Sequence, residues 1–404
     1  MIDVVFYFQV HQPYRLGKWR PGDRIRNLGY FDEPLNRLVV ERVAERCYVP
    51  MNTLLLDRIE RTDGQFRCAF SLSGTVIQQL RDWVPDALDS FVALAESGNV
   101  EFLCETSEHS LAAVTDLDEF ADQVAIQKRT VTDLFGAPTS FRDTELILDN
   151  TICKKVEDLG FECMLGEGAD RLLGWRSPQV PYRPKGCARL KLLLRSYSLS
   201  DDIAFRFSNR KWPSYPLFAD TYAGWLHDVP PPAQFIGLFM DYETFGEHQS
   251  AQTGILDFMR SLPEQVLQDP SFRFRTPAQV AAEREAITEL DIATPVSWAD
   301  VERNLSAWLG NPMQVAANQA IYALRKDVIA AAAVRPELLD IWRHFTTSDH
   351  VYYVATKHHS DAEVHEYFSP YDSPYAAFVT LMTAFDDLRL QVGKALQTLQ
   401  KQKQ

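Results

Sequence analysis

The segment Asp241–His248 places three carboxyl groups and an imidazole directly after the apolar run Phe235–Met240. Because successive strand residues alternate between the two faces of a sheet, Asp241 and Glu243 are predicted to point the same way. Acids at the carboxyl end of a barrel strand belong to active sites more often than to the core. The segment is therefore a candidate site for acid and base chemistry, with a solvated loop after an edge strand as the competing interpretation.

A second pair of acids lies on a separate predicted strand, Ser140–Glu145, which follows the turn-forming segment Gly136–Pro138. Asp143 and Glu145 share one face of that strand, so either side chain could be the partner of the first site. Two carboxyl groups across one glycosidic bond can hydrolyse it, because one attacks or activates water and the other protonates the leaving oxygen. Arg142 beside them is either a substrate clamp or, as is commoner, the counter-ion of a neighbouring acid.

Composition limits the class of protein. The 404 residues are 46% hydrophobic, which allows a large core and roughly two domains. A net charge of -14 argues against nucleic acid and anionic membranes as partners, since both need basic surface. The six cysteines form no Cys-x-x-Cys pair, which favours buried thiols and a reducing compartment. The N-terminal segment Met1–Val10 has no basic region, and no stretch approaches the roughly 20 apolar residues of a membrane span. We therefore expect a cytoplasmic protein without a membrane partner.

Short apolar or β-rich runs alternate with segments of helical periodicity, as in repeated βα units of a parallel sheet. The seven predicted strands are Val4–Val10, Phe66–Leu72, Val100–Cys104, Ser140–Glu145, Phe161–Leu165, Leu190–Tyr197 and Phe235–Met240. The helical segments between them include Leu35–Arg58, Val76–Ser97, Asp118–Leu134 and Thr151–Leu159. Several runs are apolar at consecutive positions, which is typical of strands buried on both faces. A barrel and a doubly wound sheet both fit this pattern.

Polar residues at the strand ends decide between these two folds. His11, Glu105, Glu145 and Asp241 follow the first, third, fourth and last predicted strands, and side chains spread over so many strands converge only at a barrel mouth. Beyond Pro295 the pattern becomes helical. The helices predicted there are Trp298–Leu309, Gln314–Ala333, Pro336–Phe345 and Tyr375–Gln400. We predict a barrel domain over residues 1–292 and a helical domain over residues 293–404.

Five segments together resemble glycoside hydrolase family 57 and its alpha-amylase-like branch. They are His11–Leu16 (with Tyr30–Asn36 in support), Val100–Leu111, Phe141–Ile147, Asp241–His248 and Thr347–Tyr353. The resemblance implies an incomplete TIM-type barrel of seven βα units, (β/α)7, followed by a helical domain, in agreement with the strand count. It also implies that Glu145 is the nucleophile and Asp241 the acid/base. The family often has Asn where Asp143 stands, so this extra acid is expected to affect the ionisation of the nucleophile.

The resemblance further implies a retaining enzyme that cleaves alpha-1,4-glucosidic bonds of starch, glycogen and maltooligosaccharides. A 4-alpha-glucanotransferase or a glucan branching enzyme would use the same site, and the sequence does not separate these activities. Two functions of a different kind also fit: a metal-dependent hydrolase of the polysaccharide deacetylase type, with His11 and Asp241 as ligands, and a non-catalytic glucan-binding homologue. No His-x-x-x-His pair is present, so we expect neither a metal nor another cofactor. The sequence leaves the oligomeric state undefined.

The candidate substrate-binding residues combine imidazoles, carboxylates and aromatic rings. They are His11, Glu105, His109, Trp175, Trp225, Glu243, His248, Asp349 and His350. Neutral imidazoles both donate to and accept from sugar hydroxyls, and indole faces can stack on sugar rings. The imidazoles, the tryptophans and Asp349 each have a structural alternative: a satisfied core histidine for each imidazole, core packing for each tryptophan, and a helix cap for Asp349.

Overall fold

The computed structural model describes residues 1–357, 365, 367 and 369–402. Its main sheet contains all seven predicted strands in the order β3-β2-β1-β8-β7-β5-β4, and every pairing is parallel. The strands are β1 (Ile2–Val10), β2 (Cys68–Leu72), β3 (Val100–Phe102), β4 (Ser140–Arg142), β5 (Cys163–Glu167), β7 (Lys191–Arg195) and β8 (Phe235–Asp241).

The two ends of this sheet meet, so the sheet curls into a nearly closed barrel. Cys104, just beyond β3, forms a parallel bridge with Phe141 of β4. Its N–H donates to the Ser140 carbonyl at 3.0 Å, and its own carbonyl accepts from the Arg142 N–H at 2.9 Å. The predicted seven-stranded (β/α) barrel is therefore confirmed.

Some short strands were not predicted. β11 (Phe272–Phe274) adds to the first residues of β1, and two further ladders pair β6 (Arg183–Pro184) with β12 (Glu289–Leu290) and β9 (Phe245–Gly246) with β10 (Gln249–Ser250). Strands of two or three residues are too short to show an alternating pattern in the sequence.

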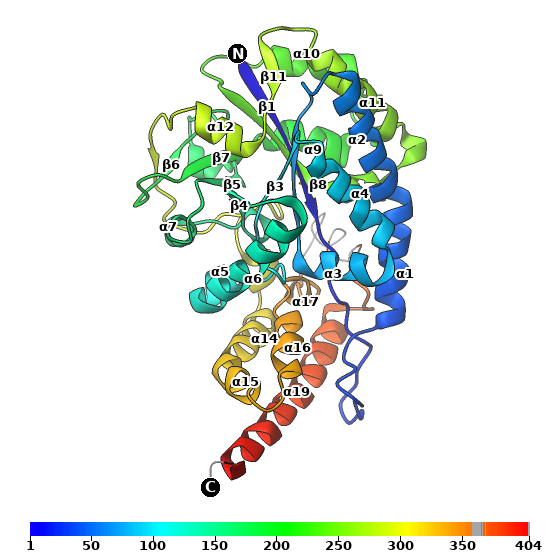
Figure 1. The fold of residues 1–404 in the computed structure, drawn as a ribbon, viewed down its shortest axis with the longest axis vertical. Helices are drawn as coiled ribbons and strands as arrows, with labels where there is room; N and C mark the ends of the chain where they lie inside the picture. The colour runs from blue at the N-terminus through cyan, green and yellow to red at the C-terminus, as the bar shows by residue number, and fades with distance from the viewer. Residues whose placement is uncertain (358–364, 366, 368, 403–404) are drawn as a thin grey trace.

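Helices surround the barrel (Figure 1). They are α1 (Glu33–Val43), α2 (Val49–Arg61), α3 (Gly74–Trp83), α4 (Pro85–Glu96), α5 (Ala112–Thr115), α6 (Leu117–Phe135), α7 (Asn150–Asp158), α8 (Asp170–Leu173), α9 (Tyr197–Asp201), α10 (Ala219–His227), α11 (Ile255–Val266) and α12 (Pro277–Glu283). Two predicted helices around the barrel are divided. A π-helical turn, Ala44–Tyr48, separates α1 from α2 just before Pro50. Val84, which precedes Pro85, leaves the helical region and separates α3 from α4, because a proline disfavours helical geometry in the residue before it.

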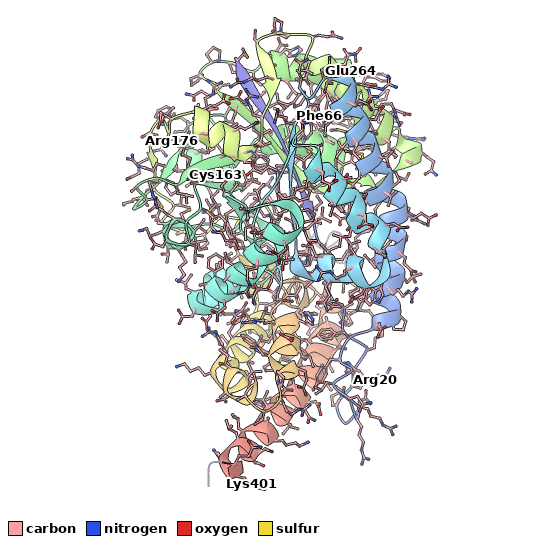
Figure 2. All side chains as sticks on the ribbon, in the orientation of Figure 1. Arg20, Phe66, Cys163, Arg176, Glu264 and Lys401 are labelled. Carbon is pink, nitrogen blue, oxygen red and sulfur yellow. The ribbon has the colours of Figure 1, made fainter. Side chains whose placement is uncertain are left out.

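Strand alternation sorts the side chains of the barrel into an outer and an inner set. Along β1, Phe6 and Phe8 pack outward against the helices, whereas Val5 and Tyr7 join a small apolar cluster inside the barrel. Polar side chains continue the inward rows at the carboxyl ends of the strands, where Gln9 and Asp241 line a cavity. All six cysteines are buried and free, as predicted, and Figure 2 shows Cys163 within the body of the molecule.

The remaining helices lie beyond the carboxyl end of β1, in the lower part of Figure 1. They are α13 (Ser306–Leu309), α14 (Pro312–Ala323), α15 (Arg325–Ala331), α16 (Glu337–Phe345), α17 (Asp349–Tyr352) and α19 (Pro374–Gln402). The predicted helix Trp298–Leu309 is wrong over most of its length, since only Ser306–Leu309 is helical. The Ser297 N–H bonds the Arg303 carbonyl and the Ser297 hydroxyl bonds the Asn304 carbonyl, and these bonds hold the preceding segment as a loop.

One core cluster joins this helical region to the outside of the barrel. It contains Phe141 and Leu192 from barrel strands together with Trp308, Trp342 and Phe385 from the helices. The boundary between residues 292 and 293 stays a prediction. Across the part of the chain that the structure describes, no helix has the length and apolar character needed to cross a membrane.

Candidate active site

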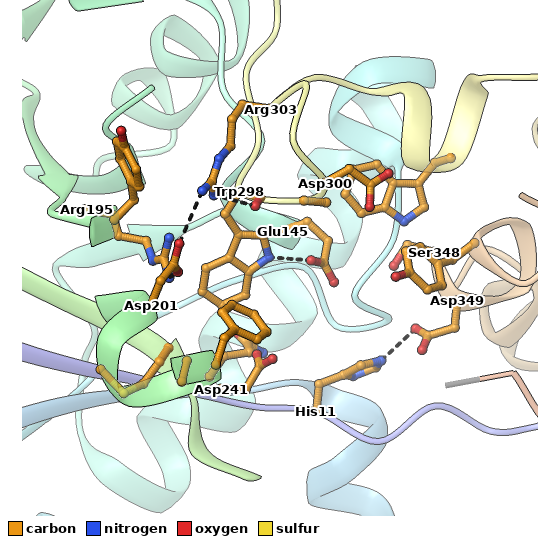
Figure 3. Close-up of a pocket in the computed structure, with 18 of the residues that line it drawn as sticks. His11, Glu145, Arg195, Asp201, Asp241, Trp298, Asp300, Arg303, Ser348 and Asp349 are labelled. Atoms are coloured by element: carbon orange, nitrogen blue, oxygen red, sulfur yellow. Dashed lines mark hydrogen bonds and ion pairs between the residues drawn. The ribbon is translucent and has the colours of Figure 1, made fainter. Parts of the chain in front are cut away.

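A cavity of about 750 Å³ opens at the carboxyl ends of the barrel strands. Glu145 and Asp241 both line it, and Trp298 and Asp349 reach it from the segments that follow the barrel (Figure 3). The arrangement follows from parallel strands, whose carboxyl ends all meet at one mouth.

Asp241 is the last residue of β8. Burial and the nearby charge of Glu145 raise its pKa to about 6. Both causes act in the same direction, because each disfavours the carboxylate. Asp241 therefore keeps its proton to a higher pH than an ordinary aspartate, which suits a general acid.

Glu145 lies in the 3₁₀ turn Thr144–Leu146 that follows β4, with a left-handed backbone at φ 55°. Each carboxylate oxygen accepts one hydrogen bond, Oε1 from His109 Nε2 at 3.1 Å and Oε2 from Trp298 Nε1 at 2.5 Å. Burial alone would raise the pKa of Glu145. The hydrogen bond and charge of His109 lower it, and so do the charge of Arg142 and the hydrogen bond from Trp298. The resulting pKa lies below the usual range. Strained backbones of this kind cluster at functional sites.

His109 connects the nucleophile candidate to Glu105. Its Nδ1 donates to Glu105 Oε2 at 2.9 Å, and Gln9 Nε2 donates to Glu105 Oε1 at 3.1 Å. Burial would lower the pKa of His109, but its hydrogen bonds to Glu105 and Glu145 raise it to about 9. His109, which lines the cavity, is thus an imidazolium that favours the charged form of Glu145.

Glu105, predicted to bind substrate, lies behind His109 and outside the cavity. Its side chain is fully buried and does not line the cavity, because the short β3 ends at Phe102 and both carboxylate oxygens of Glu105 are engaged by Gln9 and His109. Glu105 therefore contacts the site only through His109.

The structure also separates Asp143 from Glu145, which the strand pattern alone left as alternatives. Asp143 is fully buried and outside the cavity, and burial raises the pKa of its carboxyl well above the ordinary value. Its two oxygens have no hydrogen-bond partner among the described residues.

Arg142 is fully buried too, with Nη1 4.0 Å from Glu105 and its guanidinium 5.0 Å from the Trp298 ring centre, which favours the counter-ion role over a substrate clamp.

His11 and Asp349 pair across the cavity mouth. His11 Nε2 donates to Asp349 Oδ2 at 2.9 Å, and its Nδ1 accepts from the Ser73 hydroxyl at 2.7 Å. Burial and the charge of His109, whose ring stacks on His11 at 4.0 Å, lower the pKa of His11, so the imidazole is neutral. Asp349 is therefore a cavity residue that reaches the barrel, and its side chain makes no helix cap.

Glu243 and His248, both predicted substrate-binding residues, line the cavity. Tyr48 Oη donates to Glu243 Oε1 at 2.5 Å, and Gln12 Nε2 donates to the same oxygen at 3.4 Å. Burial and the charge of Asp241 raise the pKa of Glu243 to about 8, whereas burial lowers the pKa of His248 to about 4. Both side chains are therefore neutral near pH 7 and offer hydrogen bonds rather than charge.

His350, predicted to bind substrate, lies outside the cavity. Its ring is buried among Phe31 and Phe345, its Nε2 donates to the His344 carbonyl at 3.1 Å, and burial lowers its pKa to about 4. One helical step separates it from Asp349, so the two side chains point to different sides of α17. The structural role considered for this histidine therefore applies.

Both predicted stacking tryptophans also lie outside the cavity. Trp175 is 93% exposed, because Gly174 ends α8 with a positive φ and leaves the following ring in solvent. Trp225 packs at the edge of the core against Trp212 and Tyr222, with ring centres 6.0 and 5.9 Å away. Local sequence, glycine-rich or aromatic, does not show which rings reach a cavity.

Several cavity residues were missed by the sequence reasoning. Arg195 ends β7, but the predicted strand ran on to Tyr197, so the strand-end rule did not select it. The sequence did not indicate that Trp298 and Arg303 reach the cavity, because both lie in a segment that was predicted to be helical. Among the described residues, no group of three or more His, Cys, Asp and Glu side chains is arranged to hold a metal ion.

A parallel barrel that presents two carboxyl groups of opposite pKa shift in one cavity belongs to the class of barrel enzymes with a carboxylate pair. The model of glycosyl hydrolase family 57 matches residues 5–293, and the chain belongs to that family. It is 38% identical over 407 residues to a protein of Methanocaldococcus jannaschii described as "Putative alpha-amylase", covering 97% of this chain and 85% of that protein. The family resemblance seen in the sequence is thereby confirmed, and the chain is a glycoside hydrolase of this family.

Solved structures with the same fold include a branching enzyme of Thermococcus kodakaraensis and a 4-alpha-glucanotransferase of Thermococcus litoralis. The first has a TM-score of 0.67 at 14% identity, over 99% of this chain and 94% of that chain. The second has a TM-score of 0.64 at 14% identity, over 87% of this chain but only 56% of that chain. At this identity the two likenesses show the fold alone.

Proposed function

We propose that the chain hydrolyses alpha-1,4-glucosidic bonds of starch-type glucans and maltooligosaccharides with retention of configuration. Glu145 acts as the nucleophile and Asp241 as the acid and base. The observation that carries this proposal is the opposite pKa shift of two carboxyl groups in one cavity, since Glu145 is held as carboxylate while Asp241 keeps its proton up to about pH 6. Double displacement needs this pair of ionisation states at the start of the reaction.

In the first step, Asp241 donates its proton to the glycosidic oxygen while a Glu145 oxygen forms a bond to the anomeric carbon. The C–O bond to the leaving sugar breaks, and its electron pair stays on the protonated oxygen. In the second step, Asp241 takes a proton from water, whose oxygen bonds the anomeric carbon as Glu145 leaves as carboxylate. The imidazolium of His109 favours that departure, because it stabilises the charge that returns to Glu145.

Product analysis on maltooligosaccharides and soluble starch tests the proposal. Wild type is expected to produce new reducing ends, with the α-anomer first in a time-resolved NMR spectrum, and Glu145→Gln and Asp241→Asn to produce almost none. Redistribution of chain lengths without new reducing ends would instead identify a transferase. First formation of the β-anomer, or full activity in both variants, would overturn the carboxylate assignment.

Asp143→Asn is the matched control for these variants. Asp143 is an acid two residues from Glu145 but lies outside the cavity, and burial raises its pKa well above the ordinary value, which favours the neutral carboxyl group. The amide has nearly the shape of that neutral carboxyl group, so activity is expected to stay within about threefold of wild type.

A further inference from the structure

The loop Ser297–Arg303 enters the cavity from beyond the last barrel strand and touches Glu145 twice. The Trp298 backbone N–H donates to the Glu145 carbonyl at 3.1 Å, and its indole Nε1 donates to Glu145 Oε2 at 2.5 Å. Figure 3 shows this indole bond beside Asp241. The loop therefore fixes both the backbone and the side chain of Glu145.

Two arginines and the barrel interior hold the Trp298 ring in place. The guanidinium groups of Arg142 and Arg195 lie 5.0 and 5.6 Å from its ring centre, and the ring packs against the apolar cluster inside the barrel. A cation near an aromatic face is attracted by the ring quadrupole. The indole N–H thus has a set direction toward Glu145 before any substrate binds.

Arg303 stabilises the C-terminal end of the loop. Its Nη1 donates to the Trp298 carbonyl at 2.7 Å and lies 3.4 Å from Glu167, and its Nη2 lies 3.4 Å from Asp201. Glu167 ends β5 and Asp201 ends α9. Arg303 therefore ties the loop to two separate parts of the barrel mouth, and Figure 3 shows the contact with Asp201.

We propose that Trp298 is a positioning residue for the nucleophile and that Arg303 acts on Glu145 through Trp298. The inference rests on the proposed function, in which Glu145 forms the glycosyl ester. When that ester is hydrolysed, the bond between the anomeric carbon and the Glu145 oxygen breaks, and its electron pair returns to the carboxylate. Hydrogen bonds to a carboxylate are stronger than hydrogen bonds to a neutral ester. The indole N–H therefore assists the second step more than the first.

The test compares Trp298→Phe with wild type on an aryl maltoside, whose good leaving group makes the first step fast. The variant keeps the ring but removes the N–H. We expect kcat to fall about 10- to 100-fold, with KM falling in parallel because the glycosyl enzyme accumulates. The acidic limb of the kcat/KM profile should also move to higher pH, since one donor to the Glu145 carboxylate is lost.

Arg303 provides a second pair of variants. Arg303→Met removes the donor to the Trp298 carbonyl. It should lower kcat and move the acidic limb of the kcat/KM profile to higher pH, both to a smaller extent than Trp298→Phe does. Arg303→Lys, which can still donate there, should restore most of both. This pair keeps the inference testable if Trp298→Phe folds poorly.

Trp342→Phe is the control for loss of a buried indole N–H. Trp342 Nε1 donates to the Ile321 carbonyl at 2.8 Å and is outside the cavity. This variant should lower the melting temperature without moving the pH profile or changing kcat.

Two outcomes would overturn the inference. If Trp298→Phe raises KM with kcat and the pH profile unchanged, Trp298 is a sugar-binding platform rather than a positioning residue. If kcat and pH profile both equal those of wild type, the indole bond has no role in turnover. Glu145→Gln separates these failures from failure of the proposed function, because that variant is inactive if Glu145 is the nucleophile and active if it is not.

Discussion

Replacing Glu105 with glutamine removes a buried charge that never touches the cavity. The new side chain keeps nearly the same shape, and its amide can still bond His109 Nδ1, which lies 2.9 Å from the native carboxylate. The pKa of His109 is about 9 in place of the ordinary 6.5, which corresponds to roughly 3 kcal/mol in favour of the imidazolium. Without the Glu105 charge, the bond to Glu145 is left to oppose burial, and the ring is expected to become neutral at pH 7.

The loss of that imidazolium changes both catalytic carboxyl groups in the same direction. Its charge lowers the pKa of Glu145, which it contacts at 3.1 Å, and also lowers the pKa of Asp241. Coulomb's law at an effective dielectric constant of about 20 gives roughly 4 kcal/mol for unit charges about 4 Å apart. Because the Glu145 side chain is 25% exposed, solvent screening reduces this, and a change of about 1 to 3 pH units is expected.

The assay is kcat/KM on a maltooligosaccharide between about pH 4 and 9, with thermal melts to confirm folding. Glu105→Gln should move the whole bell-shaped profile to higher pH, with the larger displacement on the acidic limb. Glu119→Gln is the control, since Glu119 is equally buried but pairs with Arg325 and Arg343 away from the cavity. An unchanged profile with uniformly lower kcat/KM would refute the reasoning and leave Glu105 with a purely structural role.

Three further outcomes follow from particular side chains. The pKa of His350 in the folded protein is about 4, below the ordinary 6.5. As the pH falls, the unfolded chain therefore takes up a proton at this residue before the folded protein does. The free energy of unfolding should decrease by up to about 3 kcal/mol between about pH 6.5 and pH 4. His350→Gln should reduce the difference in unfolding free energy between about pH 7 and 4.5, as measured by urea denaturation. A difference equal to that of wild type would contradict this prediction. Trp175→Ala should leave kcat/KM on long maltooligosaccharides within about twofold, because this ring lies outside the cavity; a large rise in KM would restore the stacking prediction. Phe205→Ala should raise KM about 2- to 10-fold, since Phe205 lines the cavity with 66% of its surface exposed; an unchanged KM would argue against a sugar contact there.

The sequence by itself determined the strands of the barrel and both carboxyl candidates. Apolar runs such as Phe235–Met240, bounded by turns and helical periodicity, report local conformation directly. A polar residue at the end of such a run lies toward the barrel mouth, although Glu105 shows that it need not reach the cavity. For this reason Glu145 and Asp241 could be placed at the mouth before any contact was known, and the family resemblance then gave them roles.

Only the tertiary structure decided which side chains meet at that mouth. His11 and Asp349 are separated by 338 positions yet lie 2.9 Å apart, and the Trp298 loop reaches Glu145 from a segment whose pattern indicates a helix. Periodicity carries no information on such pairs, because closure of the barrel and packing of the helical region set their distance. The same limit explains why Glu105 acts only through His109, why His350 is a core residue and why Trp175 lies in solvent.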